Sequence, residues 1–294
     1  MTPAGVRGGA GVASGRGGPA AGRTSLTTAQ TQLVCLLGNP VAHSMSPQLH
    51  TAAFASCGID AVYVACAVTD VRAAVTGLGV LGALGANITV PYKRTVWELV
   101  ERRTEEAQRI GATNTLFREG GQWVADNTDA LGLQRVLHAD VGLQAGEAVV
   151  LFGAGGAARA AAVALGRLGA RGRGEARRVE QAAEVQQLAL DAGADTLDVH
   201  ARPSVFINAT PLGLHGEVLP ERFHALAPDQ LALDLVYGRK PTPFVRAARA
   251  AGATAWDGLG MLVAQAGVSF ERWTGVEAPL AAMWDAARSH LGDR

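Results

Sequence analysis

Residues 147–158 read EAVVLFGAGGAA, a short apolar run followed by a glycine-rich turn and the start of an Ala-rich helix. An uninterrupted apolar run of this length is typical of a strand buried on both faces of a parallel sheet. In the turn, Gly153 permits a tight bend, Gly155 lets the backbone approach a pyrophosphate, and Ala158 permits close packing of the helix. Because the N-terminus of a helix attracts anions, the stretch indicates a dinucleotide-binding βα unit.

Strand and helix patterns alternate along the chain on both sides of this unit, which predicts an α/β fold with a mostly parallel sheet. The length of 294 residues favours two domains. Apolar patterns and turn signals predict strands at 33–37, 62–66, 86–90, 147–152, 205–208 and 231–236, a hairpin of 114–118 with 122–125, and helices at 48–57, 71–78, 96–103, 105–110, 242–251, 259–274 and 278–291.

Composition excludes several classes of protein. With 48% hydrophobic residues and 26 basic against 26 acidic side chains, the chain is neither a disordered polyelectrolyte nor a polybasic nucleic-acid binder. Three cysteines without a C-x-x-C spacing and seven histidines without H-x-x-x-H spacing support no disulfide framework and no metal site. We therefore expect a cytoplasmic protein with a small-molecule substrate, no membrane span and no nucleic-acid partner, and a disordered tail over residues 1–30.

The segment that follows the dinucleotide helix distinguishes NADP from NAD. An acid there binds the ribose hydroxyls of NAD, whereas arginines bind the 2′-phosphate of NADP. Residues 172–178 read GRGEARR, which has little β propensity. Arg177 and Arg178 favour NADP, while Glu175 keeps NAD possible, and an ordinary solvated surface segment also accounts for these charges.

Further segments, in a fixed order, carry a resemblance to a known family. They read GNPVAHSMSP at 38–47, NITVPYK at 87–93, GATNT at 111–115, DNTD at 126–129, GAGGA at 153–157, NATPLG at 208–213, DLVY at 234–237 and DGLGMLVAQ at 257–265. Their order and spacing resemble those of the shikimate dehydrogenase family from about residue 33 to the end of the chain. The resemblance implies an enzyme that reduces 3-dehydroshikimate to shikimate with NADPH in the biosynthesis of chorismate and the aromatic amino acids.

The resemblance also implies a domain plan and a set of site residues. An N-terminal α/β substrate domain, residues 31–128, would face a Rossmann-like NADP-binding domain, residues 129–257, and the C-terminal helices of residues 258–294 would return to the substrate domain. Lys93 and Asp129 would be the catalytic pair. Substrate contacts would fall on Ser44, Ser46, Thr89, Asn114, Asp129, Tyr237 and Gln265, with Asn87 supporting the pocket. Cofactor contacts would fall on Gly153, Ala154, Gly155, Gly156, Ala157, Arg177, Arg178, Glu105, Leu235 and Gly258.

One departure from the family concerns the cofactor. Family members usually read Asn-Arg-Thr after an apolar strand, whereas here Ala176-Arg177-Arg178 follows a glycine-rich one. Arg177 keeps the arginine, and Arg178 can supply a second charge-assisted bond to a 2′-phosphate.

The residue types suit the implied chemistry. Reduction of a ring ketone needs a proton delivered to the carbonyl oxygen as negative charge develops there. Lys93 can donate that proton and accept it in the reverse direction, while Asp129 can hold a substrate hydroxyl and orient the ammonium. Serine, threonine and amide side chains suit a substrate that carries a carboxylate and hydroxyls.

Two alternatives remain open from the sequence. One is an NAD-dependent quinate/shikimate dehydrogenase, and the other is a non-catalytic shikimate-binding relative whose nucleotide site has degraded. The sequence leaves the choice between a monomer and a homodimer open as well.

Overall fold

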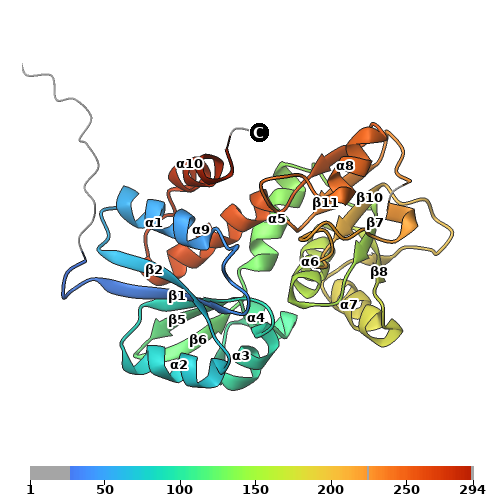
Figure 1. The fold of residues 1–294 in the computed structure, drawn as a ribbon. Helices are drawn as coiled ribbons and strands as arrows, with labels where there is room; N and C mark the ends of the chain where they lie inside the picture. The colour runs from blue at the N-terminus through green and yellow to red at the C-terminus, as the bar shows by residue number, and fades with distance from the viewer. Residues whose placement is uncertain (1–26, 224, 293–294) are drawn as a thin grey trace, which may run out of the picture.

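The computed structural model describes residues 27–223 and 225–292, and these contain two six-stranded sheets. Figure 1 shows the sheets in separate lobes, with α5 (Asp129–Ala139) between them. The tail expected over residues 1–30 lies almost wholly outside the described residues. No helix within 27–223 or 225–292 has the length and apolar character needed to cross a membrane.

The first sheet has the strand order β2-β1-β3-β5-β6-β4. Its strands are β1 (Gln32–Gly38), β2 (Ala61–Ala67), β3 (Gly85–Ile88), β4 (Arg102–Arg103), β5 (Thr115–Glu119) and β6 (Gln122–Asp126). The expected hairpin is present as β5–β6, and because β5 is antiparallel to both β3 and β6, this sheet is mixed.

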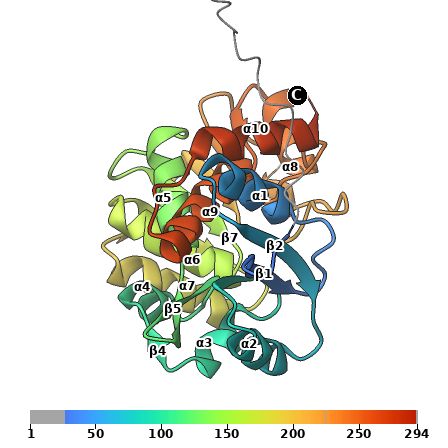
Figure 2. The same cartoon turned by 90° about the vertical axis from the view of Figure 1, so that its left-hand side faces the viewer.

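Alternate residues of β1 face different layers of helices. Val34 and Leu36 pack in one apolar cluster with residues of α1, α9 and α10, whereas Cys35 and Leu37 pack in another with residues of α2 and α3. Figure 2 shows α1 and α9 on one side of β1 and β2, with α2 and α3 on the other. The helices are α1 (Ser46–Ser56), α2 (Val71–Val80), α3 (Lys93–Leu99), α4 (Glu105–Ile110), α9 (Leu259–Thr274) and α10 (Leu280–Leu291).

The second sheet is parallel throughout, in the order β12-β11-β10-β7-β8-β9. Its strands are β7 (Ala148–Phe152), β8 (Arg171–Glu175), β9 (Asp195–Thr196), β10 (Val205–Asn208), β11 (Leu231–Asp234) and β12 (Thr254–Trp256). Helices α5, α6 (Gly156–Arg167) and α7 (Val179–Asp191) pack on one face, and α8 (Pro243–Ala250) with the 3₁₀ turn η1 (Glu221–Phe223) packs on the other.

Several element ends differ from expectation for physical reasons. The strand expected over 86–90 ends at Ile88, since Pro91 removes a backbone donor just beyond it. The helix expected over 96–103 starts at Lys93 and ends at Leu99, because Arg102 and Arg103 pair with β6 instead. The strands β4, β9 and β12 were not expected, because runs of two or three residues carry no readable periodicity.

The segment with the weakest strand propensity nevertheless forms β8. It pairs with β7 along its whole length, so its position in the sheet outweighs its glycines. The Gln186 side chain of α7 also bonds the strand, accepting from Gly174 N at 2.9 Å and donating to Gly172 O at 3.1 Å. A Cβ at Gly174 would lie 3.1 Å from Ala182 O, so this glycine allows α7 to pack closely, whereas a Cβ at Gly172 would meet nothing within 4 Å.

This difference predicts that alanine stabilises the chain at Gly172 but not at Gly174. We expect Gly172→Ala to raise the free energy of unfolding by about 0.5 kcal/mol, because it restricts the unfolded chain without a clash in the strand. Gly174→Ala is the matched control, and we expect no gain or a loss there. Urea unfolding of both variants checks this, and a Gly172→Ala protein no more stable than the parent contradicts it.

Candidate active site

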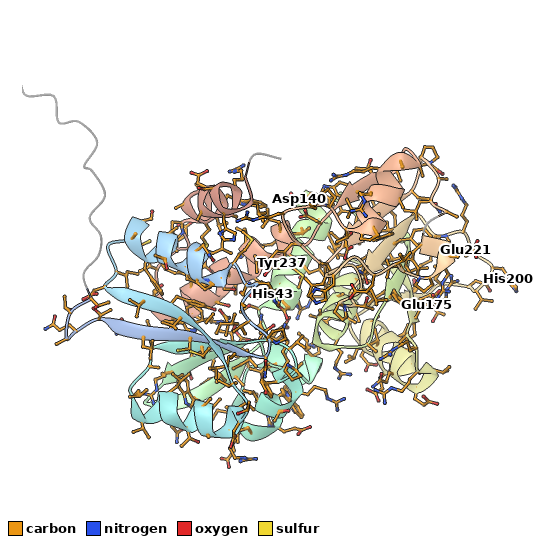
Figure 3. All side chains as sticks on the ribbon, in the orientation of Figure 1. His43, Asp140, Glu175, His200, Glu221 and Tyr237 are labelled. Carbon is orange, nitrogen blue, oxygen red and sulfur yellow. The ribbon has the colours of Figure 1, made fainter. Side chains whose placement is uncertain are left out.

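A cavity of about 450 Å³ lies between the two lobes. It receives residues from loops of the first sheet, from the starts of α3, α5 and α6, and from α9. Figure 3 labels His43 and Tyr237, which come from the loops after β1 and β11 and both line this cavity. Of the residues expected at the site, those that line it are Ser44, Ser46, Asn87, Thr89, Lys93, Asn114, Asp129, Gly155, Gly156, Ala157, Leu235, Tyr237, Gly258 and Gln265.

A lysine and an aspartate are in contact within the cavity. Lys93 is the first residue of α3 and Asp129 the first residue of α5, so two helix starts bring them together. The Lys93 ammonium donates to Oδ2 of Asp129, and the two side chains are 17% and 6% exposed. Oδ1 of Asp129 accepts from Asn114 Nδ2 at 2.8 Å, so both carboxylate oxygens have partners.

A buried polar network lies behind this pair. Asn114 Nδ2 donates to Thr128 Oγ1 at 2.9 Å, while Thr128 N donates to Asn114 Oδ1 at 2.8 Å. Ser269 Oγ lies 3.0 Å from Thr128 Oγ1 and accepts from Asn87 Nδ2 at 3.1 Å. Tyr63 Oη in turn donates to Asn87 Oδ1 at 2.7 Å. Because each buried amide is bonded through both its oxygen and its nitrogen, the network fixes which atoms face the cavity.

Hydroxyl groups gather at another wall of the cavity. Ser44 Oγ donates to Ser46 Oγ at 3.2 Å, at the start of α1. Burial raises the pKa of the Tyr237 hydroxyl, and hydrogen bonds with the Met45 backbone and the Ser44 side chain partly offset that effect. Ser44, Ser46 and Tyr237 therefore present neutral hydrogen-bonding groups to the cavity.

The glycine-rich turn borders the cavity from the second lobe. Gly153 has φ +135°, and a Cβ there would lie 2.7 Å from Ala209 O, so the position requires glycine. A Cβ at Gly155 would meet no protein atom within 4 Å, which leaves space beside the backbone N–H groups at the start of α6. This open concavity at a helix N-terminus fits a pyrophosphate. A Cβ at Gly156 would lie 3.0 Å from Lys93 Cδ, so the turn and the lysine side chain are neighbours.

The remaining cofactor positions lie outside the cavity. Arg177 and Arg178 are exposed just beyond β8, and Gly153 N donates to Glu175 O at 2.8 Å, so that strand end adjoins the turn. Glu105 is exposed at the start of α4 and does not line the cavity. Its assignment as a cofactor contact stays a prediction with no support from this geometry.

Sequence reasoning missed several residues that the structure places at the site. Arg94 and Met261 line the cavity, and Tyr63 and Ser269 belong to the buried network. Ser269 carried a usable signal, because it lies four residues after Gln265 and thus on the same face of a helix. Tyr63 carried none, since its position in an alternating strand also suits an ordinary core aromatic.

The buried carboxylate of Asp234 positions the start of the segment that brings Leu235 and Tyr237 to the cavity. Asp234 Oδ1 accepts from Asn208 Nδ2 at 2.8 Å and from Val236 N at 3.0 Å, and Oδ2 accepts from Thr242 Oγ1 at 2.6 Å. Burial raises the pKa of Asp234 to about 6, although these three bonds favour the charged form, and Asp257 raises it further. The carboxylate therefore ties the ends of β10 and β11 to the start of α8.

Known proteins resemble this chain over most of its length. The family model described as "Shikimate dehydrogenase substrate binding domain" matches residues 36–116, and "Shikimate 5'-dehydrogenase C-terminal domain" matches residues 258–288. A protein of Halobacterium salinarum named "Shikimate dehydrogenase (NADP(+))" is 43% identical over 266 residues, covering 87% of this chain and 98% of its own. A protein of Anaeromyxobacter sp. with the same name is 43% identical over 284 residues, covering 92% and 100%.

Solved structures extend the likeness to three dimensions. The structure of shikimate 5-dehydrogenase from Thermus thermophilus, in complex with NADP(H) and shikimate, matches with a TM-score of 0.78 and 32% identity. The match covers 88% of this chain and 99% of that one.

The environment of Asp234 predicts a pH-dependent stability. Its pKa is about 6 in the folded chain against 3.8 for the ordinary group, so its contribution to stability is fully present below pH 3.8 and is lost as the pH rises through 6. Relative to Asp234→Asn, we expect the parent to lose about 3 kcal/mol of unfolding free energy across that window. Urea unfolding of both proteins from pH 4.5 to 7.5 should show about 2 kcal/mol of this loss, because the rest falls between pH 3.8 and 4.5. A difference that does not change with pH contradicts the assignment.

Proposed function

The chain belongs to the shikimate dehydrogenase family, and we propose that it catalyses the reversible, NADP-dependent reduction of 3-dehydroshikimate to shikimate. One observation carries the proposal at the level of residues. The Lys93–Asp129 pair lies in a cavity that the glycine-rich turn also borders, so an ammonium, a carboxylate and a pyrophosphate site face one space. A pocket for a small cyclic acid alone would not need that turn.

Residues of the second lobe would hold the dinucleotide. The backbone from Gly153 to Ala157 and the start of α6 would bind the pyrophosphate, and Arg177 with Arg178 would bind the 2′-phosphate. Leu235 and Gly258, which line the same cavity as Lys93, would contact the nicotinamide end of the cofactor. Bound NADPH supplies the hydride.

Lys93 would serve as the general acid. Its ammonium can donate a hydrogen bond to the carbonyl oxygen and transfer the proton as negative charge develops there. Because the transfer needs the two groups within hydrogen-bond distance, it is fast only when the substrate is correctly placed. Asp129 would hold the ammonium in place and accept a hydrogen bond from the adjacent substrate hydroxyl. In the oxidative direction, Lys93 would take the proton back from the hydroxyl.

Neutral polar side chains would bind the rest of the substrate. Ser44 and Ser46 can donate to its carboxylate, and Tyr237 lies beside them. Thr89, Asn114 and Gln265 can bond the ring hydroxyls, because all three line the cavity. Every residue that this mechanism uses comes from one chain, so it accommodates either a monomer or a homodimer. The cytoplasmic location expected from the sequence belongs to this proposal as well.

Steady-state oxidation of shikimate and quinate with NADP⁺ and NAD⁺ tests the proposal against its rivals. We expect the largest kcat/KM for shikimate with NADP⁺. A preference for NAD⁺ would favour a quinate/shikimate dehydrogenase. Binding of shikimate without turnover with either nucleotide would favour the non-catalytic relative and contradict the enzyme.

Replacement of Lys93 should separate catalysis from binding. We expect Lys93→Ala to lower kcat by about 10³-fold, since it removes the proton donor, while the Kd for shikimate changes by less than about tenfold. Lys240, the chain's only other lysine, is exposed, and Lys240→Ala is the matched control. Steady-state kinetics and calorimetric titration measure both quantities. A Lys93→Ala enzyme with near-normal kcat removes this residue from the mechanism.

A side chain at Gly155 should block the cofactor without unfolding the chain. A Cβ there meets no protein atom within 4 Å but fills the space at the helix start, so we expect Gly155→Val to weaken NADPH binding by about a hundredfold. Thermal unfolding should stay near that of the parent, and the Kd for shikimate should be unchanged. Fluorescence titration with NADPH measures the effect, and the parent affinity in the variant would place the pyrophosphate elsewhere.

A further inference from the structure

Glu175 occupies the position at which an acid would select NAD. It is the last residue of β8 and pairs in register with Phe152, the last residue of β7, directly before the glycine-rich turn. An acid at this strand end accepts bonds from the ribose hydroxyls of NAD and repels a 2′-phosphate. A chain that uses NADP must therefore prevent this carboxylate from facing the ribose.

Two arginines donate hydrogen bonds to the Glu175 carboxylate. Arg222 donates to Oε2 through Nε at 2.6 Å and through Nη2, and Arg173 donates to Oε1 through Nε at 3.3 Å. The Glu175 side chain is only 17% exposed, whereas that of Arg222 is 53% exposed. Both oxygens of the acid are thus directed toward protein donors, and Arg222 covers it from the solvent side.

The position of Arg222 is fixed by its neighbour Phe223. The guanidinium carbon of Arg222 lies 5.4 Å from the centroid of the Phe223 ring, and this ring is fully buried. Phe223 packs against Phe152 with centroids 5.1 Å apart and against Phe206 at 5.7 Å. The 3₁₀ turn η1 is therefore anchored to the end of β7, beside the glycine-rich turn. Figure 3 labels Glu175 and Glu221 in this lobe, away from His43 and Tyr237.

We propose that Arg222 is a specificity-determining residue, which makes the chain select NADP by neutralising Glu175 and holding it away from the ribose. This inference rests on the proposed function for the identity of the cofactor. With the acid paired to Arg222 and Arg173, Arg177 and Arg178 present uncompensated positive charge to the 2′-phosphate. Arg222 acts through Glu175 and is not itself the main ligand of the phosphate.

A double-mutant cycle on the full chain tests this route, with 2′,5′-ADP and 5′-AMP as probes in calorimetric titrations. We expect Arg222→Ala to weaken binding of 2′,5′-ADP by about tenfold, because the exposed Glu175 carboxylate then repels the phosphate. Binding of 5′-AMP, which keeps the 2′-hydroxyl, should be unchanged or tighter. In a Glu175→Gln chain, the same Arg222→Ala change should alter 2′,5′-ADP binding by less than about threefold.

Controls separate this effect from loss of charge or fold. Arg202 forms a bidentate pair with Asp229 just before the starts of β10 and β11, at the amino ends of the strands, whereas Glu175 lies at the carboxyl end of β8. Arg202→Ala therefore removes the same charge without touching the site. We expect it to leave both affinities unchanged. If Arg222→Ala does not fold, as judged by circular dichroism, Arg222→Gln replaces it in the cycle with the same expected outcome.

Two results would overturn the proposal. An equal loss of 2′,5′-ADP affinity from Arg222→Ala in both backgrounds would make Arg222 a direct phosphate ligand, and no loss in either would remove it from selection. The probes need no turnover. A chain that follows the cycle as expected but does not oxidise shikimate would contradict the proposed function alone.

Discussion

The contact between the Lys93 ammonium and the Asp129 carboxylate is the interaction on which the site depends. The two residues come from different segments of the chain. Lys93 begins α3 in the first lobe, while Asp129 begins α5, the helix that leads to the second. A carboxylate in the first turn of a helix is favoured by the helix dipole, and the bond from Asn114 holds its second oxygen. The pair is therefore placed by the helix start and by the buried network.

The same helix α5 also holds the two lobes in a defined relation. A Cβ at Gly132 would lie 2.7 Å from the backbone nitrogen of Gln265, so α5 and α9 approach closely at this glycine. Gln265 and Ser269 lie on the facing side of α9 and bond the network that holds Asn114 and Thr128. Close backbone packing and polar satisfaction thus meet at one helix crossing, and a shift of either helix would leave buried amides without partners.

Sequence reasoning found the parts of this arrangement that depend on local pattern. The buried strand before Gly153, the hairpin β5–β6 and the long helix α9 followed from periodicity and turn residues, and family resemblance gathered residues that line one cavity. It did not find β4, β9 or β12, whose pairing exists only once the sheets form. It also undervalued β8, because two glycines lower strand propensity while the pairing with β7 and the bonds from Gln186 are tertiary. Network members such as Tyr63 carry no local signal, since only the fold brings strand β2 beside Asn87.

Two carboxylates of the chain, Asp129 and Glu175, differ in what their basic partners do. Asp129 pairs with the Lys93 ammonium inside the cavity and holds it in position there. At the end of β8, the Glu175 carboxylate is paired with Arg173 and Arg222, and two exposed arginines, Arg177 and Arg178, follow in the chain. The charge of Asp129 is needed to position Lys93, whereas the charge of Glu175 would oppose binding of a 2′-phosphate and is neutralised by its arginine partners. By itself, Glu175 would favour NAD, because an acid at this strand end bonds the ribose hydroxyls. In our proposal, selection of NADP depends on its neutralisation by Arg222, which lies 47 residues further along the chain.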